Sequence, residues 1–328
     1  FKDAKTILLE QNYRSTQTIL DGAMAVIDRN PNRTHKKLFT QERKGEKITL
    51  FVAADDREEA AYVVEAVRQG LRSHKHKPSD FAVMYRTNAQ SRLLEEAFRR
   101  EGINYRLVGA QRFYGRREVK DMIAYLRLVS NPKDEISLSR VINLPPRGIG
   151  EKTLEKLAEL ARTSELTLGE AVLRLSEPNS AELLTALGRE GTRLEPFGKR
   201  LAQWRHVADN NPPVILFDRI IEDMGYQVYI QDNSEEGQDR WENVLELRQV
   251  VMEYAELPDF LEAMALVADQ DTLPENVDTP TLLTLHAAKG LEFEHVFITG
   301  LDEMLLPHSR SRDDPEALEE ERRLLYVG

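Results

Sequence analysis

A chain of 328 residues in which 41% of the side chains are apolar is long enough for two domains with substantial hydrophobic cores. It has no cysteine, which excludes disulfides, thiol nucleophiles and thiolate metal sites, and no apolar run approaches the roughly 18 residues of a membrane span. The net charge of −11 divides into +8 for residues 1–120 and −19 for residues 121–328, which fits either a basic phosphate-binding surface or uneven surface charge alone.

The first 110 residues alternate between strand and helix patterns. We expect helices from Ser15 onward, at 56–73 and at 90–100, and strands at 48–53, 80–86 and 104–109. This succession of strand, helix and strand predicts a parallel sheet, because the connection between two parallel strands must cross from one end of the sheet to the other.

From about residue 116 to residue 268 the pattern is almost entirely helical. The expected helices cover 117–130, 138–144, 151–162, 194–208, 214–223, 240–255 and 259–268. Strand patterns return at 281–285 and 295–299. The predicted fold class is therefore α/β: a parallel-sheet domain, formed by residues 1–114 and 277–328, is interrupted by a mostly helical insertion at 115–276. Three consecutive domains are the alternative, but the two late strands are too few to form a domain by themselves.

Two segments carry side chains that suit a nucleotide. Tyr13 and Arg14 lie at the mouth of the first helix, where an aromatic ring can stack on a base and a guanidinium can hold a phosphate. Glu292 follows the strand at 281–285, and its carboxylate can accept from a ribose hydroxyl. The sequence has no G-x-x-x-x-G-K-[ST] phosphate loop, so these residues would form only half of a nucleotide site. Taken alone, Tyr13 and Arg14 also fit an ordinary surface pair.

Polar residues also follow the predicted strands, at the edge where ligands bind in open parallel sheets. Arg86 and Asn88 end one strand and can bind phosphate, sugar or base edges, although a turn with an Asn cap explains them as well. His286 and Lys289 lie in a turn of small residues that also fits a structural turn, and His308 fits an ordinary loop histidine. We propose no metal site, because no second His or Cys lies at ligand spacing.

The segment Arg147-Gly148-Ile149-Gly150 lies between two predicted helices. A Gly-apolar-Gly turn before a helix exposes backbone N–H groups that can hold an anion. Helix–hairpin–helix modules bind DNA phosphates with this pattern and without reading sequence. A plain turn between helices is the alternative. Gly150-Glu-Lys-Thr153 is not a phosphate loop, because its Gly and Lys are not adjacent and no strand precedes it.

Four segments in this order resemble the superfamily 1 DNA helicases of the UvrD/PcrA/Rep type. Leu9-Glu-Gln-Asn-Tyr-Arg-Ser15 resembles motif IV, and Tyr85-Arg-Thr-Asn-Ala-Gln-Ser91 resembles the neighbouring DNA-contacting motif. Thr284-Leu-His-Ala-Ala-Lys-Gly-Leu-Glu-Phe293 resembles motif V, and residues 320–328 resemble the start of motif VI. The resemblance covers nearly the whole chain. It implies a second RecA-like motor domain with its mostly helical inserted subdomain.

The resemblance implies a role for each matching residue. In the nucleotide site, Tyr13 stacks on adenine, Arg14 is the catalytic contact to the γ-phosphate and Glu292 binds the ribose, with Gln11 beside them. The residues implied in contacts with single-stranded DNA, or in coupling them to ATP, are Arg86, Asn88, Arg112, His308, Thr284, His286 and Lys289. The residues implied to grip duplex phosphates are Gly148, Ile149, Gly150, Lys152 and Thr153.

The implied activity is that of an ATP-dependent DNA helicase of 3′→5′ polarity that acts in repair or replication. Its implied partners are single-stranded DNA, duplex junctions, repair proteins and an N-terminal RecA-like half that holds most of the ATP and Mg²⁺. The phosphate loop and the Mg²⁺-binding carboxylates are absent, and motif VI stops before its Thr-Arg-Ala. We therefore expect a piece of a longer polypeptide that is inactive alone. A non-catalytic DNA-binding or scaffolding module is the alternative; a nuclease-linked relative is a third reading, although no nuclease carboxylate cluster is visible.

Overall fold

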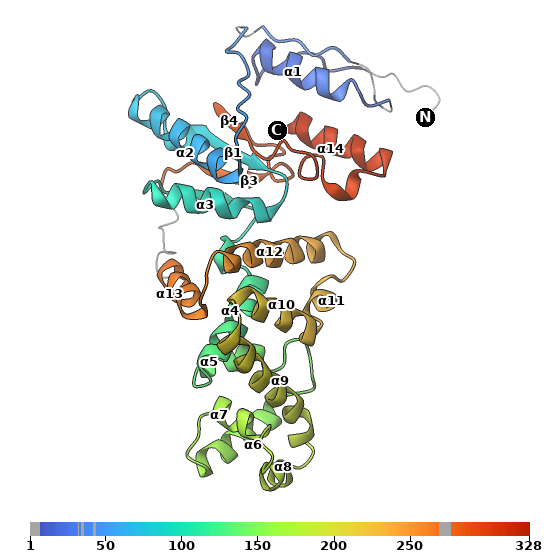
Figure 1. Cartoon of the computed structure of the whole chain (residues 1–328). Helices are drawn as coiled ribbons and strands as arrows, with labels where there is room; N and C mark the ends of the chain where they lie inside the picture. The colour runs from blue at the N-terminus through green and yellow to red at the C-terminus, as the bar shows by residue number, and fades with distance from the viewer. Residues whose placement is uncertain (1–6, 32, 34–35, 42–43, 269–276) are drawn as a thin grey trace, which may run out of the picture. The chain divides into compact units, whose positions relative to one another are not determined.

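The computed structural model describes residues 7–31, 33, 36–41, 44–268 and 277–328, which form two compact units (Figure 1). One unit combines Phe1–Arg112 with Glu275–Gly328, and the other is Phe113–Pro274. The chain thus leaves the first unit and later returns to it. The sequence placed the first change of domain at residue 114, and its second expected boundary, at 276, lies outside the described residues.

The first unit contains four parallel strands in the order β2-β3-β1-β4. They are β1 (Phe81–Tyr85), β2 (Arg106–Val108), β3 (Thr281–Thr284) and β4 (His295–Ile298). The two late strands flank β1 on both sides, with Ala82 opposite Thr281 and Phe81 opposite His295. The sheet is therefore built from two segments, 81–108 and 281–298, that the helical unit separates in the chain. The mixed α/β fold class predicted from the sequence is confirmed.

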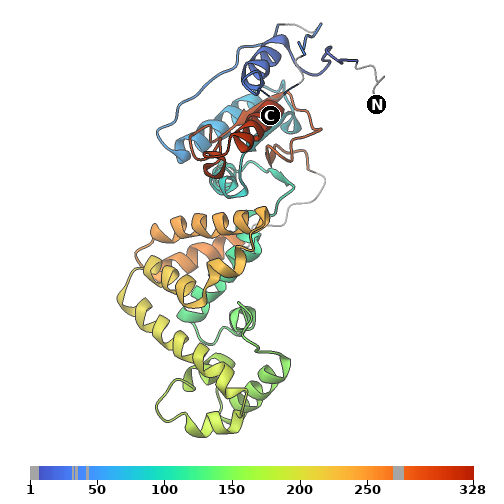
Figure 2. The same ribbon diagram turned by 90° about the vertical axis from the view of Figure 1, so that its right-hand side faces the viewer.

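Helices cover both faces of this sheet (Figures 1 and 2). Helices α2 (Asp56–Arg72), which precedes β1, and α3 (Ser91–Arg100), which follows it, pack on one face against alternate residues of β1. The other face packs against α14 (Pro315–Val327), and α1 (Gln17–Ile27) contacts α14 in turn. Alternation of side chains along β1 fixes this division, because successive residues of a strand point to opposite faces. Those packed toward α2 and α3 are Phe81, Val83 and Tyr85; those on the α14 side are Ala82 and Met84.

The strand expected at 48–53 is wrong. Ile48, Leu50 and Val52 are exposed, and the segment has no strand partner among the described residues. An apolar run becomes a strand only when a neighbour accepts its backbone hydrogen bonds, and local sequence cannot supply that neighbour. Phe51 instead stacks on Tyr62 of α2, with ring centroids 3.9 Å apart.

The second unit contains helices joined by turns and loops, and no strand among the residues that the structure describes there. Its helices are α4 (Arg117–Ser130), α5 (Glu135–Val141), α6 (Glu151–Thr163), α7 (Leu168–Arg174), α8 (Ala181–Leu187), α9 (Gly191–Asn210), α10 (Pro213–Met224), α11 (Tyr226–Ile230), α12 (Glu235–Met252) and α13 (Leu257–Ala268). Helix α9 runs between the α6–α8 group and α10 (Figure 2). Its Trp204 lies edge-on to Tyr125 and Phe197, with ring centroids 5.7 and 6.1 Å away, at the centre of the core.

The sequence missed α7, α8 and α11, which have only five to seven residues each and so carry little periodic signal. It also placed α5 too late, at 138–144. Asp134 begins this helix by accepting from the Ser137 N–H at 3.0 Å. The helix does not reach residue 144, because the ring of Pro145 disfavours helical geometry at the residue before it. No described helix combines the length and apolar character that crossing a membrane would require.

Candidate functional site

Arg14 and Glu292 form an ion pair although 278 residues separate them, with Arg14 Nε 3.1 Å from Glu292 Oε2. Asn12 sets the local geometry, because its Oδ1 accepts from the N–H groups of Arg14 at 2.9 Å and Ser15 at 2.8 Å. The two charged side chains are 53% and 71% exposed. Such an exposed pair contributes at most about 1 kcal/mol, so a phosphate or a ribose can replace either partner at little cost.

The residues around this pair leave space for a ligand. Tyr13 is 79% exposed, as a ring that stacks on a base must be. Gln11 forms an isolated parallel bridge with Phe39, and the neighbouring Asn12 N–H donates to the Phe39 carbonyl at 2.8 Å. The segment is thereby held by its backbone while Tyr13 stays accessible.

A tight turn follows β3 and carries three of the predicted residues. The Ala288 N–H donates to the Thr284 carbonyl at 3.1 Å, and the Ala287 N–H donates to Thr284 Oγ1 at 3.3 Å. Buried Ala288 anchors the turn, while His286 and Lys289 are exposed. The turn lies at the carboxyl edge of the parallel sheet, the edge where such sheets bind ligands.

Arg86, one of the residues predicted to contact DNA, has its guanidinium bound to a carboxylate. Its Nε and Nη2 atoms lie 2.8–3.1 Å from both oxygens of Glu321 on α14, and the two side chains are only 16% and 5% exposed. Burial would raise the pKa of Glu321, but the bonds from Arg86, the His308 N–H and Ser311 together lower it below its ordinary value. Glu321 is therefore an anion that fixes Arg86.

His308, another residue predicted to contact DNA, is buried. The Nδ1 atom of its ring accepts from the backbone N–H of Arg310 at 3.2 Å and faces the Arg310 Nε at 3.3 Å. The backbone N–H of His308 donates to the Glu321 carboxylate at 3.2 Å. The contacts of Arg86 and His308 with DNA stay predictions. In this structure Glu321 joins Arg86, which follows β1, to the backbone of His308.

Asn88 and Arg112 are both half-buried. The Oδ1 atom of Asn88 is buried and has no hydrogen-bond partner among the described residues. The neighbouring Gln90 Oε1 accepts from the N–H groups of Arg86 and Thr87, both at 2.9 Å. Arg112 lies over the Tyr105 ring, 5.3 Å from its centroid.

The helical unit presents the Gly148-Ile149-Gly150 turn just before α6. Asn143 Oδ1 accepts from the N–H groups of Arg147 at 2.7 Å and Ile149 at 3.2 Å, which folds the backbone into a loop. The Ile149 side chain is buried in the core and both glycines are exposed. The N–H groups of Gly148, Gly150, Glu151 and Lys152 meet no acceptor among the described residues.

Arg147 supports this turn from inside the unit. Its guanidinium donates to the carbonyls of Val141, Ile142 and Leu144 and, at 2.7 Å, to the Tyr125 hydroxyl. Burial raises the pKa of Tyr125 to about 12, so the hydroxyl keeps its proton and donates a hydrogen bond to the Leu144 carbonyl. The turn is thus preorganised by a buried hydrogen-bond network.

Three further residues lie at this turn, two that the sequence predicted and one that it missed. Thr153 is 2% exposed and its N–H donates to the Gly150 carbonyl at 3.0 Å, whereas Lys152 is exposed; the contacts of both residues with DNA stay predictions. The sequence missed Arg193 of α9, which is exposed and donates to the Gly148 carbonyl at 3.1 Å. No local pattern could identify it, because the contact spans 45 residues.

The structure also shows a cluster that the sequence did not suggest. His76, Glu294 and His295 place one ligand atom each within 4.8 Å of one another. Ligand spacing in a sequence identifies metal ligands that are near one another in the chain, whereas these residues come from two distant segments.

Comparison with known proteins agrees with the motifs. Residues 7–328 match the family model described as UvrD-like helicase C-terminal domain. Over its whole length, the chain is 39% identical to the ATP-dependent DNA helicase PcrA of Bacillus subtilis and 40% identical to that of Staphylococcus epidermidis, and it spans 45% of each relative. A match over almost the entire chain confirms the predicted resemblance, and the chain belongs to the UvrD-like helicase C-terminal domain family.

Proposed function

We propose that this chain is the C-terminal part of an ATP-dependent DNA helicase that moves 3′→5′ on single-stranded DNA in repair or replication. In this proposal residues 1–114 and 277–328 are the second RecA-like motor domain, and residues 115–276 are its inserted subdomain. The observation that carries the proposal is the contact of Arg14 with Glu292, since it joins two nucleotide-binding motifs from opposite ends of the chain. The relatives that span the whole chain are named ATP-dependent DNA helicases.

The chain would supply one face of an ATP site. Tyr13 stacks on the adenine, Glu292 accepts from the ribose, and Arg14 exchanges its exposed partner for the γ-phosphate. A second RecA-like domain would supply the phosphate loop and the ligands of Mg²⁺. An arginine that reaches the γ-phosphate only when the two domains close stabilises charge as it develops, an effect worth ~10³–10⁵ in rate in related phosphoryl transfers.

The DNA surface would lie at the carboxyl edge of the sheet. Exposed His286 and Lys289 and half-exposed Asn88 and Arg112 are the direct contacts in this proposal. Arg86 is joined through Glu321 to α14 and to the backbone of His308. The direct contacts hold the phosphate backbone and bind all sequences similarly, with an affinity that falls as salt rises.

One turn would couple the two sites. Glu292 on the nucleotide side and Lys289 on the DNA side are three residues apart and follow the same buried anchor, Ala288. A shift of this turn when the nucleotide binds would therefore move the DNA contacts as well. Repetition of this movement with each ATP gives translocation.

The Gly148–Gly150 turn would hold a duplex ahead of the moving strand. Its unpaired N–H groups lie at the positive end of the α6 dipole, and Lys152 and Arg193 flank them. The test of the whole proposal is ATP hydrolysis with single-stranded DNA present. We expect none from this chain alone and hydrolysis when it is joined to a phosphate-loop domain from a relative. Inactivity of the joined protein would instead favour a DNA-binding or scaffolding module.

A further inference from the structure

His76, Glu294 and His295 lie at the edge of the sheet that the proposed function does not use. His295 begins β4 and lies opposite Phe81, the first residue of β1. His76 belongs to the connection between α2 and β1. All three residues are therefore at the amino ends of the parallel strands, whereas the nucleotide and DNA contacts follow the carboxyl ends.

The distances within this cluster suit a small tetrahedral ion. His76 Nδ1 is 3.0 Å from His295 Nε2 and 3.5 Å from Glu294 Oε2. Zinc bonds of about 2.0–2.1 Å in tetrahedral geometry place neighbouring ligand atoms about 3.3 Å apart. The two separations from His76 bracket that value, and all three ligand atoms lie within 4.8 Å of one another.

Aromatic packing holds both imidazoles in place. The His295 ring stacks on the buried Phe81 ring, with centroids 4.8 Å apart and an angle of 18° between the planes. His76 stands edge-on to both rings, at 85° to His295 and 81° to Phe81. Side chains that are already oriented lose little conformational entropy when they bind a ligand.

The donor atoms of the cluster also suit a metal ion. A neutral imidazole keeps a nitrogen lone pair that can coordinate a cation, and the Glu294 carboxylate compensates its charge.

We propose that His76, Glu294 and His295 form a binding site for a divalent transition-metal ion, Zn²⁺ in the first place, with a fourth position left for water. Two nitrogens and one oxygen are a ligand set that Zn²⁺ accepts and that Mg²⁺, which demands oxygen ligands in an octahedron, does not. The bound ion fastens the α2–β1 connection to β4 and so braces the edge of the sheet opposite the motor contacts.

Zinc titration of the 328-residue chain tests the site. Tag-free protein is freed of metal with a chelator and titrated with Zn²⁺ against a chromogenic competitor. We expect one Zn²⁺ per chain at this site, and His76→Gln and His295→Gln should each weaken it at least tenfold, because even the loss of a residue that only supports a ligand costs about 10–100-fold. Glu294→Gln should weaken it in the same direction.

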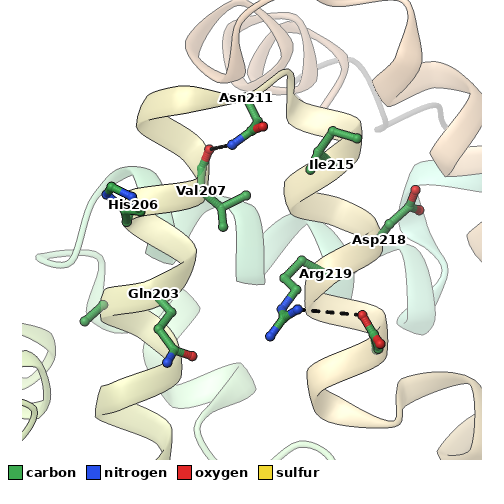
Figure 3. Close-up of a pocket in the computed structure, with 9 residues that line it drawn as sticks. Gln203, His206, Val207, Asn211, Ile215, Asp218 and Arg219 are labelled. Carbon is green, nitrogen blue, oxygen red and sulfur yellow. Dashed lines mark hydrogen bonds and ion pairs between the residues drawn. The ribbon is translucent and has the colours of Figure 1, made fainter.

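The matched control is His206→Gln. His206 is an exposed histidine of α9 in the helical unit, beside the groove between α9 and α10, and belongs to no metal-ligating group among the described residues (Figure 3). This variant should bind Zn²⁺ as the unchanged chain does, and Mg²⁺ should not compete. Thermal melts show whether each variant is folded; if His295→Gln is not, His76→Gln, which lies outside the strands of the sheet, decides. Unchanged zinc affinity in a folded His76→Gln variant, or equal weakening by His206→Gln, would show that the two imidazoles only hydrogen-bond to each other.

Discussion

Gly150 offers the sharpest test of the duplex contact, because the structure separates its role in folding from its role in binding. Gly150 caps α6 with φ −103° and ψ −176°, which any residue adopts, and a Cβ added there would meet no protein atom within 4 Å. Gly148 differs, since its φ of +72° would strain any other residue. Gly150→Ala therefore places one methyl group on the surface that a phosphate would approach, and it leaves the backbone unstrained.

The expected magnitudes differ for stability and for binding. Alanine is a poorer N-cap than glycine, which costs about 0.5–1 kcal/mol of folding stability. A hydrogen bond from a backbone N–H to a charged phosphate is worth about 1.5–3 kcal/mol, so its loss should weaken binding roughly 10-fold to 100-fold. We expect this loss for a duplex–single-strand junction and not for single-stranded DNA. ATP hydrolysis driven by single-stranded DNA should persist, because the contacts proposed for it lie in the other unit.

The assay compares the affinities for a junction and for a single strand by fluorescence anisotropy, at one salt concentration. Ser234→Ala is the matched control. Ser234 caps α12 by accepting from the Gly237 N–H at 2.9 Å, so its loss costs about 1 kcal/mol of stability without touching the turn. A Gly150→Ala variant with the junction-to-strand affinity ratio of the control would refute the backbone grip on duplex phosphate.

The remaining predictions concern the α/β unit, in a protein that also contains the phosphate-loop domain where activity is measured. Arg14→Ala should lower kcat for ATP at least ~100-fold with little change in affinity for single-stranded DNA, and hydrolysis at the normal rate would remove it from the site. Glu292→Ala should raise KM for ATP more than it lowers kcat, because a ribose contact is made equally before and during reaction; steady-state kinetics that show the reverse would contradict this role. Arg112→Ala should weaken binding to every single-stranded sequence and reduce the salt slope by about one, as titrations at several salt concentrations would show. Glu321→Gln should destabilise the fold by about 3 kcal/mol at neutral pH by leaving Arg86 without its counter-ion. Because the folded pKa of Glu321 is lowered, the stability gained from its ionised form is full above the ordinary carboxylate range and is lost as the pH falls through the folded pKa, so the melting curves of the two proteins should converge in acid.

The local pattern of apolar and polar residues was sufficient to predict much of the fold. The strands at 80–86, 104–109, 281–285 and 295–299 and most long helices were predictable, because burial of one face imposes a period of two or of 3.6 on the sequence itself. The segment 48–53 shows the limit of this reasoning. Its apolar residues favour a strand, but a strand also needs a partner, and the sequence cannot show that none of the described segments supplies one.

The same limit applies to the candidate site, where residue types were predictable and contacts were not. Tyr13, Arg14 and Glu292 were recognisable from residue type and motif order, since a nucleotide demands an aromatic ring, a guanidinium and a hydrogen-bond acceptor. Only the tertiary structure decided that Arg14 meets Glu292, that Glu321 binds Arg86, and that His76 lies beside His295. Each of these contacts joins residues more than 200 positions apart, and its existence depends on how two distant segments pack into one sheet, which no local pattern encodes.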